Sequence, residues 1–325
     1  MNETTLAICW IDVGRVVPKY LQRNLSLHET MHPNLKQYLI TDCSFKPQTT
    51  NTEVVQIQEL SESFLTSTFN QITEEKIIPF RQKNFWILTT KRFFYLYDFM
   101  VTLDLQRVLH LESDNLVLNA DRLSRLLEEV PRGLAFPMQS EFEGCGSVFY
   151  VAERDSLKRF LEFVLDKWKI SEENDMTLLG QFSKSDHVTV LPSKPNSELI
   201  VDPGAYGKYF VGSDARNFRI PMRKRGVVTD ESTSRLHEMR SLKFRLSGPP
   251  IQLFLTKNLS GEVLNLHLHS KEIPKSVNHL RKILIRSFVS HSPFWKFGRI
   301  DFLVLTERVL SKIARLLGLK EVRLR

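Results

Sequence analysis

The chain has 325 residues, of which 42% are hydrophobic and 25% are charged. This is the balance of an ordinary globular protein and excludes a mostly disordered chain. Its 13 Gly and 14 Pro also exclude collagen-like and low-complexity architectures. The length suits one large catalytic domain with an appendage.

The three cysteines, Cys9, Cys43 and Cys145, are odd in number and widely spaced. They match neither a disulfide framework nor a zinc pattern, so we expect a reducing, cytoplasmic compartment. The first residues lack the basic stretch and apolar core of a signal peptide. No run approaches the roughly 18 apolar residues that a membrane span requires.

The net charge of +8 is concentrated at the C-terminus. Residues 275–325 contain 12 Lys and Arg against three acids, a balance of +9, so the preceding residues carry −1. The basic character therefore belongs to the C-terminal segment and not to the body of the protein. We expect no nucleic-acid partner.

Strand-like and helix-like segments alternate over the first 120 residues. Short apolar runs predict strands at 6–11, 37–40, 54–57 and 107–111, and helices are predicted at 18–28 and 89–103. This alternation predicts an α/β fold with an open, mostly parallel sheet flanked by helices on both faces. Such sheets bind their ligands at the carboxyl ends of the strands.

Further along the chain we predict helices at 121–129, 154–168 and 172–179, and strands at 134–136, 147–151, 253–255 and 264–266. The pattern changes at Lys275, where two basic amphipathic helices begin, one before and one after Pro293. The predicted organisation is a catalytic domain over residues 1–273 and a helical extension over 274–325.

Glu112 and Asp114 follow the strand predicted at 107–111. Residues i and i+2 of an extended chain point the same way, so both carboxylates can face one pocket. Two neighbouring carboxylates repel each other unless a cation or hydrogen-bond donors neutralise them, and a divalent metal held there can bind a diphosphate. The alternative is a solvated turn at the end of a strand.

His267 and His269 alternate with Leu266 and Leu268, which places both imidazoles on one face of a short strand. An imidazole can complete a metal site, and Lys271 is a suitable phosphate partner. The alternative is a polar strand face in which the two histidines have no ligand.

Several motifs in a fixed order resemble those of one enzyme family. They are Trp10-Ile11, Arg92 on a long aromatic helix, His110-Leu111-Glu112-Ser113-Asp114-Asn115, Gly144-Cys145-Gly146-Ser147-Val148-Phe149, Asn174-Asp175-Met176 and His267-Leu268-His269-Ser270-Lys271. Over about residues 6 to 271, this order resembles glycosyltransferases of the GT-A type, particularly those of bacterial polysaccharide and glycolipid synthesis. The resemblance implies a Rossmann-like sheet, a nucleotide-diphosphate sugar as donor, with UDP-sugars favoured, and Mn²⁺ or Mg²⁺.

The resemblance also implies roles for the metal site. The last acid of the family's Asp-x-Asp motif, here Asp114, binds the metal that bridges the donor diphosphate. The first acid contacts the metal or the ribose. This chain has Glu112 there, which departs from the usual Asp. A late histidine completes the metal site, which points to His269.

Donor and acceptor roles are implied in the same way. Asp12 and Asp42 occupy the nucleotide-binding positions after the first two strands. The remaining donor-binding candidates are Arg92, Ser113 and Lys271. Asp175, with Glu173 in reserve, stands where inverting enzymes of this type place the base that deprotonates the acceptor. The alternative is that these acids favour a helix N-terminus through its dipole.

The expected function is therefore metal-assisted sugar transfer to a saccharide or lipid-linked acceptor, with inversion. The alternatives are a retaining transferase, a non-catalytic adaptor at a membrane surface and a metal-dependent phosphohydrolase. The basic extension predicts peripheral binding to the anionic inner face of the membrane. Its alternative is packing of these helices on the catalytic domain or on a second subunit, as in a homodimer.

Overall fold

The computed structural model describes residues 7–14, 16–74, 81–171, 173–185, 187–194, 197–211, 244–247, 251–255, 261–269 and 271–289. The helix predicted after Pro293 lies outside these residues. Among the described helices, none combines the length and the apolar character needed to cross a membrane.

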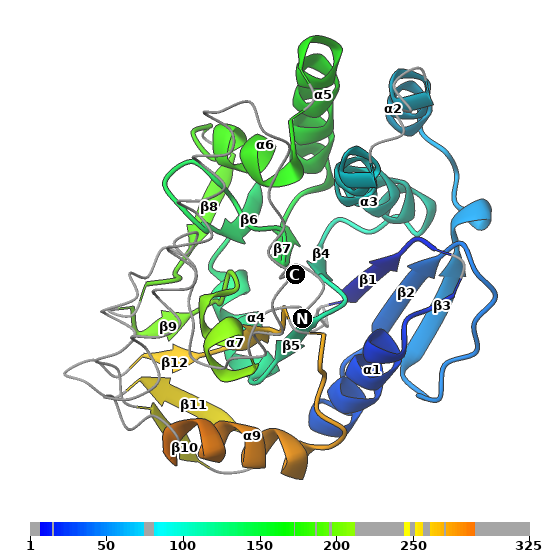
Figure 1. The fold of residues 1–325 in the computed structure, drawn as a ribbon. Coiled ribbons are helices and arrows are strands. Elements are labelled where there is room, and N and C mark those ends of the chain that lie inside the picture. Colours follow the sequence, from blue (N-terminus) through cyan, green and yellow to red (C-terminus); the bar gives the residue numbers. More distant parts are fainter. Residues whose placement is uncertain are drawn as a thin grey trace, which may run out of the picture.

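Seven strands form the central sheet in the order β3-β2-β1-β4-β7-β6-β8 (Figure 1). They are β1 (Ile8–Asp12), β2 (Gln37–Thr41), β3 (Thr52–Gln56), β4 (Val108–Leu111), β6 (Leu134–Pro137), β7 (Val148–Val151) and β8 (Val188–Leu191). Strands β3, β2, β1 and β4 run parallel, whereas β7 is antiparallel to both of its neighbours. The predicted α/β fold with a mostly parallel sheet is confirmed.

Helices cover both faces of this sheet (Figure 1). They are α1 (Lys19–Met31), α2 (Phe64–Glu74), α3 (Arg81–Thr102), α4 (Ala120–Glu128), α5 (Arg154–Ile170) and α6 (Asp175–Phe182), with a short 3-10 helix η1 (Ile57–Glu59) after β3. Alternate residues of a strand point to opposite faces. Thus Cys9 packs in the core beneath α3 and α5, while Trp10 packs in the core beneath α1 and α4.

A second group of strands lies beside the central sheet. A four-stranded sheet has the order β10-β11-β12-β9, and β13 pairs with β5. The strands are β5 (Asn115–Val117), β9 (Leu199–Ile200), β10 (Phe244–Ser247), β11 (Gln252–Leu255), β12 (Glu262–Val263) and β13 (Asn265–His267). Together with α7 (Ala205–Val211) and α9 (Val277–Val289), these strands enclose a third apolar core.

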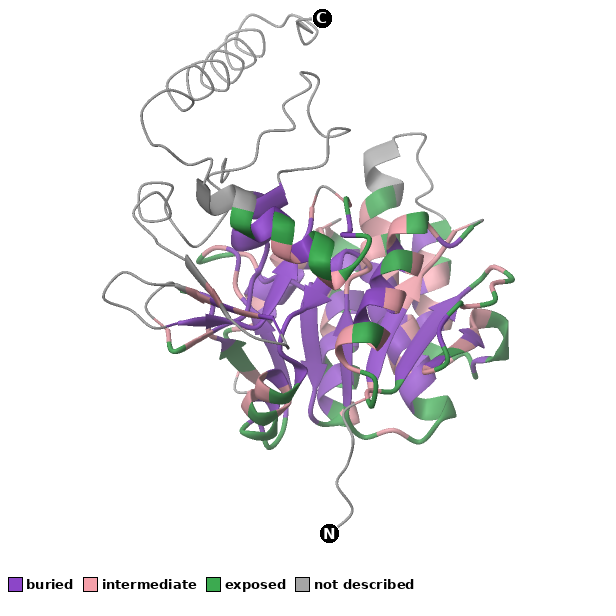
Figure 2. Cartoon of the chain, turned by 90° about the horizontal axis from the view of Figure 1, so that it is seen from below, coloured by how far each residue is buried: buried purple, intermediate pink, exposed green. Residues whose placement is uncertain are grey.

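Helix α9 packs against this third core through its apolar side. Leu280 and Leu284 are fully buried there, in the same cluster as Leu266 of β13 and Leu268, which follows that strand. Figure 2 shows the buried interior of the sheet and the alternation of buried and exposed residues along the helices. The first helix of the predicted extension therefore packs on the body of the protein. A domain boundary between residues 273 and 274 remains a prediction.

The boundaries of several elements differ from those predicted. Helix α6 begins at Asp175 and not at residue 172, because the Asn174 side chain caps it by accepting from Thr177 N at 2.8 Å. Helix α3 begins eight residues before the predicted Thr89, at Arg81. Helix α2 was not predicted. Its packing against α3 and α5, through Phe69 stacked on Phe94, is a long-range contact that local patterns do not reveal.

Candidate active site

Three acidic residues stand at one edge of the central sheet. Asp12 ends β1, Asp42 follows β2 and Glu112 follows β4. Because β2, β1 and β4 are adjacent and parallel, their carboxyl ends share that edge. This is the edge at which open α/β sheets bind ligands.

Pairing of β5 with β13 brings the late histidine strand to the acid pair. His267 lies opposite Asn115 in this antiparallel pair, and Leu268 N donates to the Asp114 carbonyl at 2.8 Å. His267 Nε2 lies 2.9 Å from Glu112 Oε2 and 3.3 Å from Asp114 Oδ1. One ligand atom from each of these three residues can be chosen so that all lie within 4.8 Å of one another.

This set of three groups fits a divalent cation. Two carboxylates and one imidazole suit Mn²⁺, and the carboxylates also suit Mg²⁺. Burial alone would lower the pKa of His267. The negative charge of Asp114 and further side-chain hydrogen bonds have the larger, opposite effect, so the pKa of His267 lies well above its usual range. The two carboxylates thus stabilise a positive charge at this point, which is what a metal ion requires.

His269 lies beside this group and not within it. Its ring centroid is 4.0 Å from that of His267, and its Nε2 is buried without a hydrogen-bond partner among the described residues. Burial and the neighbouring His267 hold the pKa of His269 well below its usual range. Gly204, with φ +130°, makes room for the ring, because a Cβ there would lie 2.4 Å from His269 Nε2. The residue that meets both carboxylates is therefore His267.

The buried carboxylate of Asp202 fixes the backbone that carries His267. Its Oδ2 accepts from His267 N at 3.0 Å and from Gly207 N at 2.7 Å, and its Oδ1 accepts from Gly204 N at 2.7 Å. Asp202 is not among the site residues predicted from the sequence. It lies two residues before Gly204, which directly precedes α7, and its side chain still accepts from backbone N–H groups of the first turn of that helix. The signal in the sequence was an acid just before a Pro-Gly turn and a helix.

Arg92 links the acid pair to the start of α6. Its guanidinium contacts Glu112 Oε1 and donates from Nη2 to Asp175 Oδ2 at 2.7 Å. Gly146 permits this placement, because a Cβ there would lie 2.7 Å from Arg92 Nη2. Burial alone would raise the pKa of Glu112. The charges and hydrogen bonds of Arg92 and His267 have the larger, opposite effect and hold the pKa of Glu112 well below its usual range.

Asp175 and Glu173 lie in different surroundings. Asp175 is buried, and its Oδ1 accepts from Thr89 Oγ1 at 3.1 Å. Burial raises the pKa of Asp175 above its ordinary value despite the opposing charge of Arg92. Glu173 instead accepts from Ser171 at 3.0 Å and from the side chain of Gln181. Of the two predicted bases, Asp175 is the one in contact with the Arg92 and Glu112 group.

Asp12 lies within electrostatic range of both Asp42 and Lys271. Asp42 Oδ1 accepts from Gly14 N at 2.8 Å, which fixes the loop after β1. Burial, reinforced by the charge of Asp42 and opposed by Lys271, raises the pKa of Asp12 to about 6. These two acids and this cation are predicted from the sequence to bind the donor, and that assignment remains a prediction.

Tyr20 of α1 connects Lys271 to Ser113. Lys271 Nζ lies 5.2 Å from the centre of the Tyr20 ring, within the range of a cation–π contact. Ser113 Oγ donates to the Tyr20 hydroxyl at 3.3 Å. Ser113 stands between Glu112 and Asp114 in the chain, so this contact joins Tyr20 and Lys271 to the carboxylate group.

Similarity to known proteins is found among solved structures. No protein-family model matches the chain, and no curated protein sequence matches it. PaToxG glycosyltransferase superposes with a TM-score of 0.37 at 11% identity, over 55% of this chain and 69% of that one. Mouse xyloside xylosyltransferase 1 superposes with a TM-score of 0.37 at 9% identity, over 60% of this chain and 87% of that one. The galactosyltransferase LgtC, solved with donor and acceptor sugar analogues, superposes with a TM-score of 0.35 at 12% identity, over 67% of this chain and 81% of that one. At these identities the likeness concerns the fold.

Proposed function

We propose that the protein is a metal-dependent glycosyltransferase that moves a sugar from a nucleotide-diphosphate sugar to a saccharide or lipid-linked acceptor. The observation that carries this proposal is one chain of polar contacts at the ligand-binding edge of the sheet. It runs from Asp175 through Arg92 and Glu112 to His267 and Asp114. Such a group contains metal ligands, a buried cation and a separate carboxylate, which are the parts that sugar transfer needs.

Glu112, Asp114 and His267 would hold Mn²⁺ or Mg²⁺. When bound, the metal supplies positive charge that stabilises the leaving diphosphate. His269, whose ring lies 4.0 Å from that of His267, is the imidazole ligand predicted from the sequence and remains the alternative. Arg92 fixes the direction of the Glu112 carboxylate, which leaves its Oε2 directed at His267.

The nucleotide side of the donor would be bound by the acids after β1 and β2. Carboxylates accept hydrogen bonds from ribose hydroxyls and base N–H groups, which suits Asp12 and Asp42. Lys271, the cation beside them, would contact the diphosphate, with Ser113 as a further polar contact. A UDP-sugar is the favoured donor on the resemblance to GT-A enzymes.

Asp175 is the proposed base for an inverting reaction, with Glu173 in reserve. Burial favours a neutral Asp175 carboxyl and so increases its basicity, whereas the hydrogen bonds from Arg92 and Thr89 stabilise the carboxylate. Those two hydrogen bonds also orient Asp175. The ion pair between Arg92 and Asp175 lowers the basicity of this carboxylate. It therefore favours the alternative, which is a retaining transferase in which Asp175 only positions the donor sugar.

Release of nucleotide diphosphate from a panel of nucleotide sugars tests the proposal. We expect slow release with at least one donor in Mn²⁺, none in EDTA and none with Asp114→Ala. The matched control is Asp166→Ala, which removes an exposed acid paired with Lys169 on α5. The anomeric configuration of a transferred sugar distinguishes inversion from retention.

Three results would contradict the proposal. Undiminished release by Asp114→Ala would remove the metal site from the mechanism. Release of inorganic phosphate from phosphate esters, with no turnover of any nucleotide sugar, would favour a phosphohydrolase. Absence of turnover with every substrate would favour the non-catalytic adaptor.

A further inference from the structure

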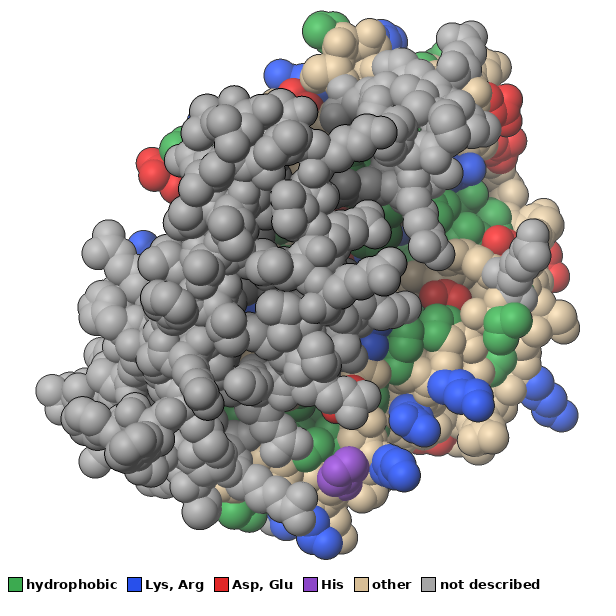
Figure 3. All heavy atoms as spheres, in the orientation of Figure 1, with side chains coloured by type: hydrophobic (Ala, Val, Ile, Leu, Met, Phe, Trp, Pro, Cys, Tyr) green, Lys and Arg blue, Asp and Glu red, His purple; other side chains and the backbone are tan. Residues whose placement is uncertain are grey.

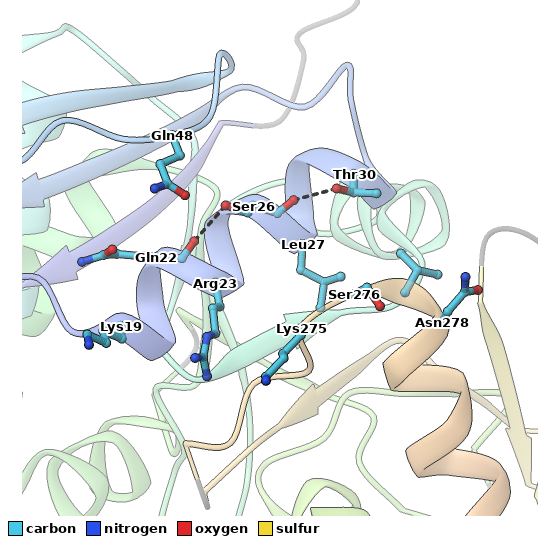
Figure 4. Close-up of a pocket in the computed structure, with 11 residues that line it drawn as sticks. Lys19, Gln22, Arg23, Ser26, Leu27, Thr30, Gln48, Lys275, Ser276 and Asn278 are labelled. Atoms are coloured by element: carbon cyan, nitrogen blue, oxygen red, sulfur yellow. Dashed lines mark hydrogen bonds between the residues drawn. The ribbon is translucent and has the colours of Figure 1, made fainter.

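A groove separate from the metal ligands lies between α1 and the start of α9. It has a volume of about 620 Å³. Figure 4 shows side chains of both helices lining it, with Arg23 and Lys275 extending toward the same gap. Lys19 and Arg23 are four residues apart on α1 and therefore share a face of the helix. In the space-filling view, Lys and Arg side chains gather over α1 (Figure 3).

The lining of this groove is cationic and polar. It contains Lys19, Arg23 and Lys275 and no acidic residue. None of these three cations forms an ion pair with another residue in the described part of the chain. Only Leu27 and Val277 contribute apolar side chains, so the groove suits a hydrated anionic ligand and not an acyl chain.

At one end of the groove, the lining residues are close in the sequence to residues of the candidate active site. Lys19 is the neighbour of Tyr20, whose hydroxyl accepts from Ser113, and Lys275 follows Lys271 by four residues. From Lys19 to Thr30 the groove follows α1 for about 16 Å, at 1.5 Å per residue. A ligand lying along α1 could therefore reach the region around Ser113 with one end.

We propose that this groove binds the acceptor and that the acceptor is an acidic saccharide bearing phosphate or carboxylate groups. The role of this saccharide as acceptor rests on the proposed transferase function, whereas the binding of an acidic saccharide in the groove does not depend on it. The volume of 620 Å³ lies within the range of about 300–1,000 Å³ for small-molecule sites. It greatly exceeds the roughly 30 Å³ that one water occupies, so an oligosaccharide fits it better than a lone inorganic anion.

Calorimetric titration of the full-length protein, without donor or metal, tests the groove. The probes are tetragalacturonate and mannose 6-phosphate, with maltotetraose as the uncharged comparison. We expect at least one anionic probe to bind, more weakly as salt rises, and maltotetraose to bind far less. The Lys19→Ala/Arg23→Ala double variant should bind that probe about tenfold more weakly or worse, since charge-assisted hydrogen bonds are lost.

The matched control is Lys158→Ala/Lys169→Ala, which removes two exposed cations from α5 and should leave binding unchanged. Equal binding by the groove variant and wild type would overturn the proposal, as would absence of binding by both anionic probes. Groove-dependent pelleting with anionic phospholipid vesicles, without saccharide binding, would assign the surface to a membrane instead. Nucleotide release requires no acceptor, so its failure would count against the transferase and not against the groove.

Discussion

Arg92 Nη2 donates to Asp175 Oδ2 across 2.7 Å, although 83 residues separate the two in the chain. The same guanidinium contacts Glu112, so one buried cation neutralises two carboxylates on different elements. Arg92 therefore fixes the position of Glu112 relative to the start of α6. Any sugar bound between them would lie against this arginine.

Arg92→Ala should destabilise the protein by about 3 kcal/mol or more, because it leaves the buried carboxylate of Asp175 without a cation and Glu112 with His267 as its only cationic partner among the described residues. Urea unfolding measures the effect. Arg159→Ala, which removes an exposed contact with His187, is the control and should change stability by less than about 0.5 kcal/mol. Equal stability of the two variants would mean that Glu112 and Asp175 are solvated in solution.

Mn²⁺ should raise the melting temperature of the wild-type protein through its binding to the folded state. At a free concentration of 100 times Kd, the stabilisation amounts to about 2.7 kcal/mol. His267→Ala should abolish the shift, because His267 contacts both carboxylates, whereas His269→Ala should only weaken it. A full shift in His267→Ala with none in His269→Ala would reverse the assignment of the two imidazoles.

The positions of Asp12 and Glu112 could be predicted from local patterns, because each follows an apolar run and parallel strands end at one edge. The partner of Glu112 could not. The sequence predicts His267 and His269 on one strand face, but β13 ends at His267, and its pairing with β5 sets His267 opposite Asn115. A side-chain hydrogen bond from Asn265 to Asn115 joins the same two strands across 150 residues. The hydrophobic pattern of a short segment does not predict which distant strand it pairs with, or in which register. The cap provided by Asp202 became evident only when its four backbone donors were in place.

Asp175→Asn should reduce turnover strongly with little change in KM if Asp175 is the general base. Such catalysis typically contributes about 10²–10⁴-fold. Glu173→Gln provides the comparison and should have a small effect, because Glu173 contacts Ser171 and Gln181 instead of the Arg92 group. A loss of less than tenfold in Asp175→Asn, with retention of the donor's anomeric configuration, would support a retaining mechanism.

The raised pKa of Asp12 should make stability depend on pH. The folded pKa of about 6 exceeds the ordinary value of 3.8, so the folded state holds this proton more tightly than the unfolded chain. Stability should therefore fall as pH rises from about 4 to 6. Asp12→Asn should remove this decrease and stabilise the protein at pH 7 by roughly 1–3 kcal/mol. Unfolding curves at several pH values measure it, and parallel wild-type and variant profiles would refute the shift.

The packing of α9 on the third core determines how membrane docking by the basic C-terminal segment can be tested. Truncation at residue 273 would remove Leu280 and Leu284 from the third core and unfold it in part. Truncation after Val289 keeps α9 and removes only residues 290–325, whose sequence carries eight Lys and Arg against three acids. Each basic residue near an anionic bilayer contributes about 1 kcal/mol, so the full-length chain should sediment with anionic vesicles at low salt and the shortened chain should not. Neutral vesicles serve as the control, and equal sedimentation of both chains would exclude these residues as the membrane anchor.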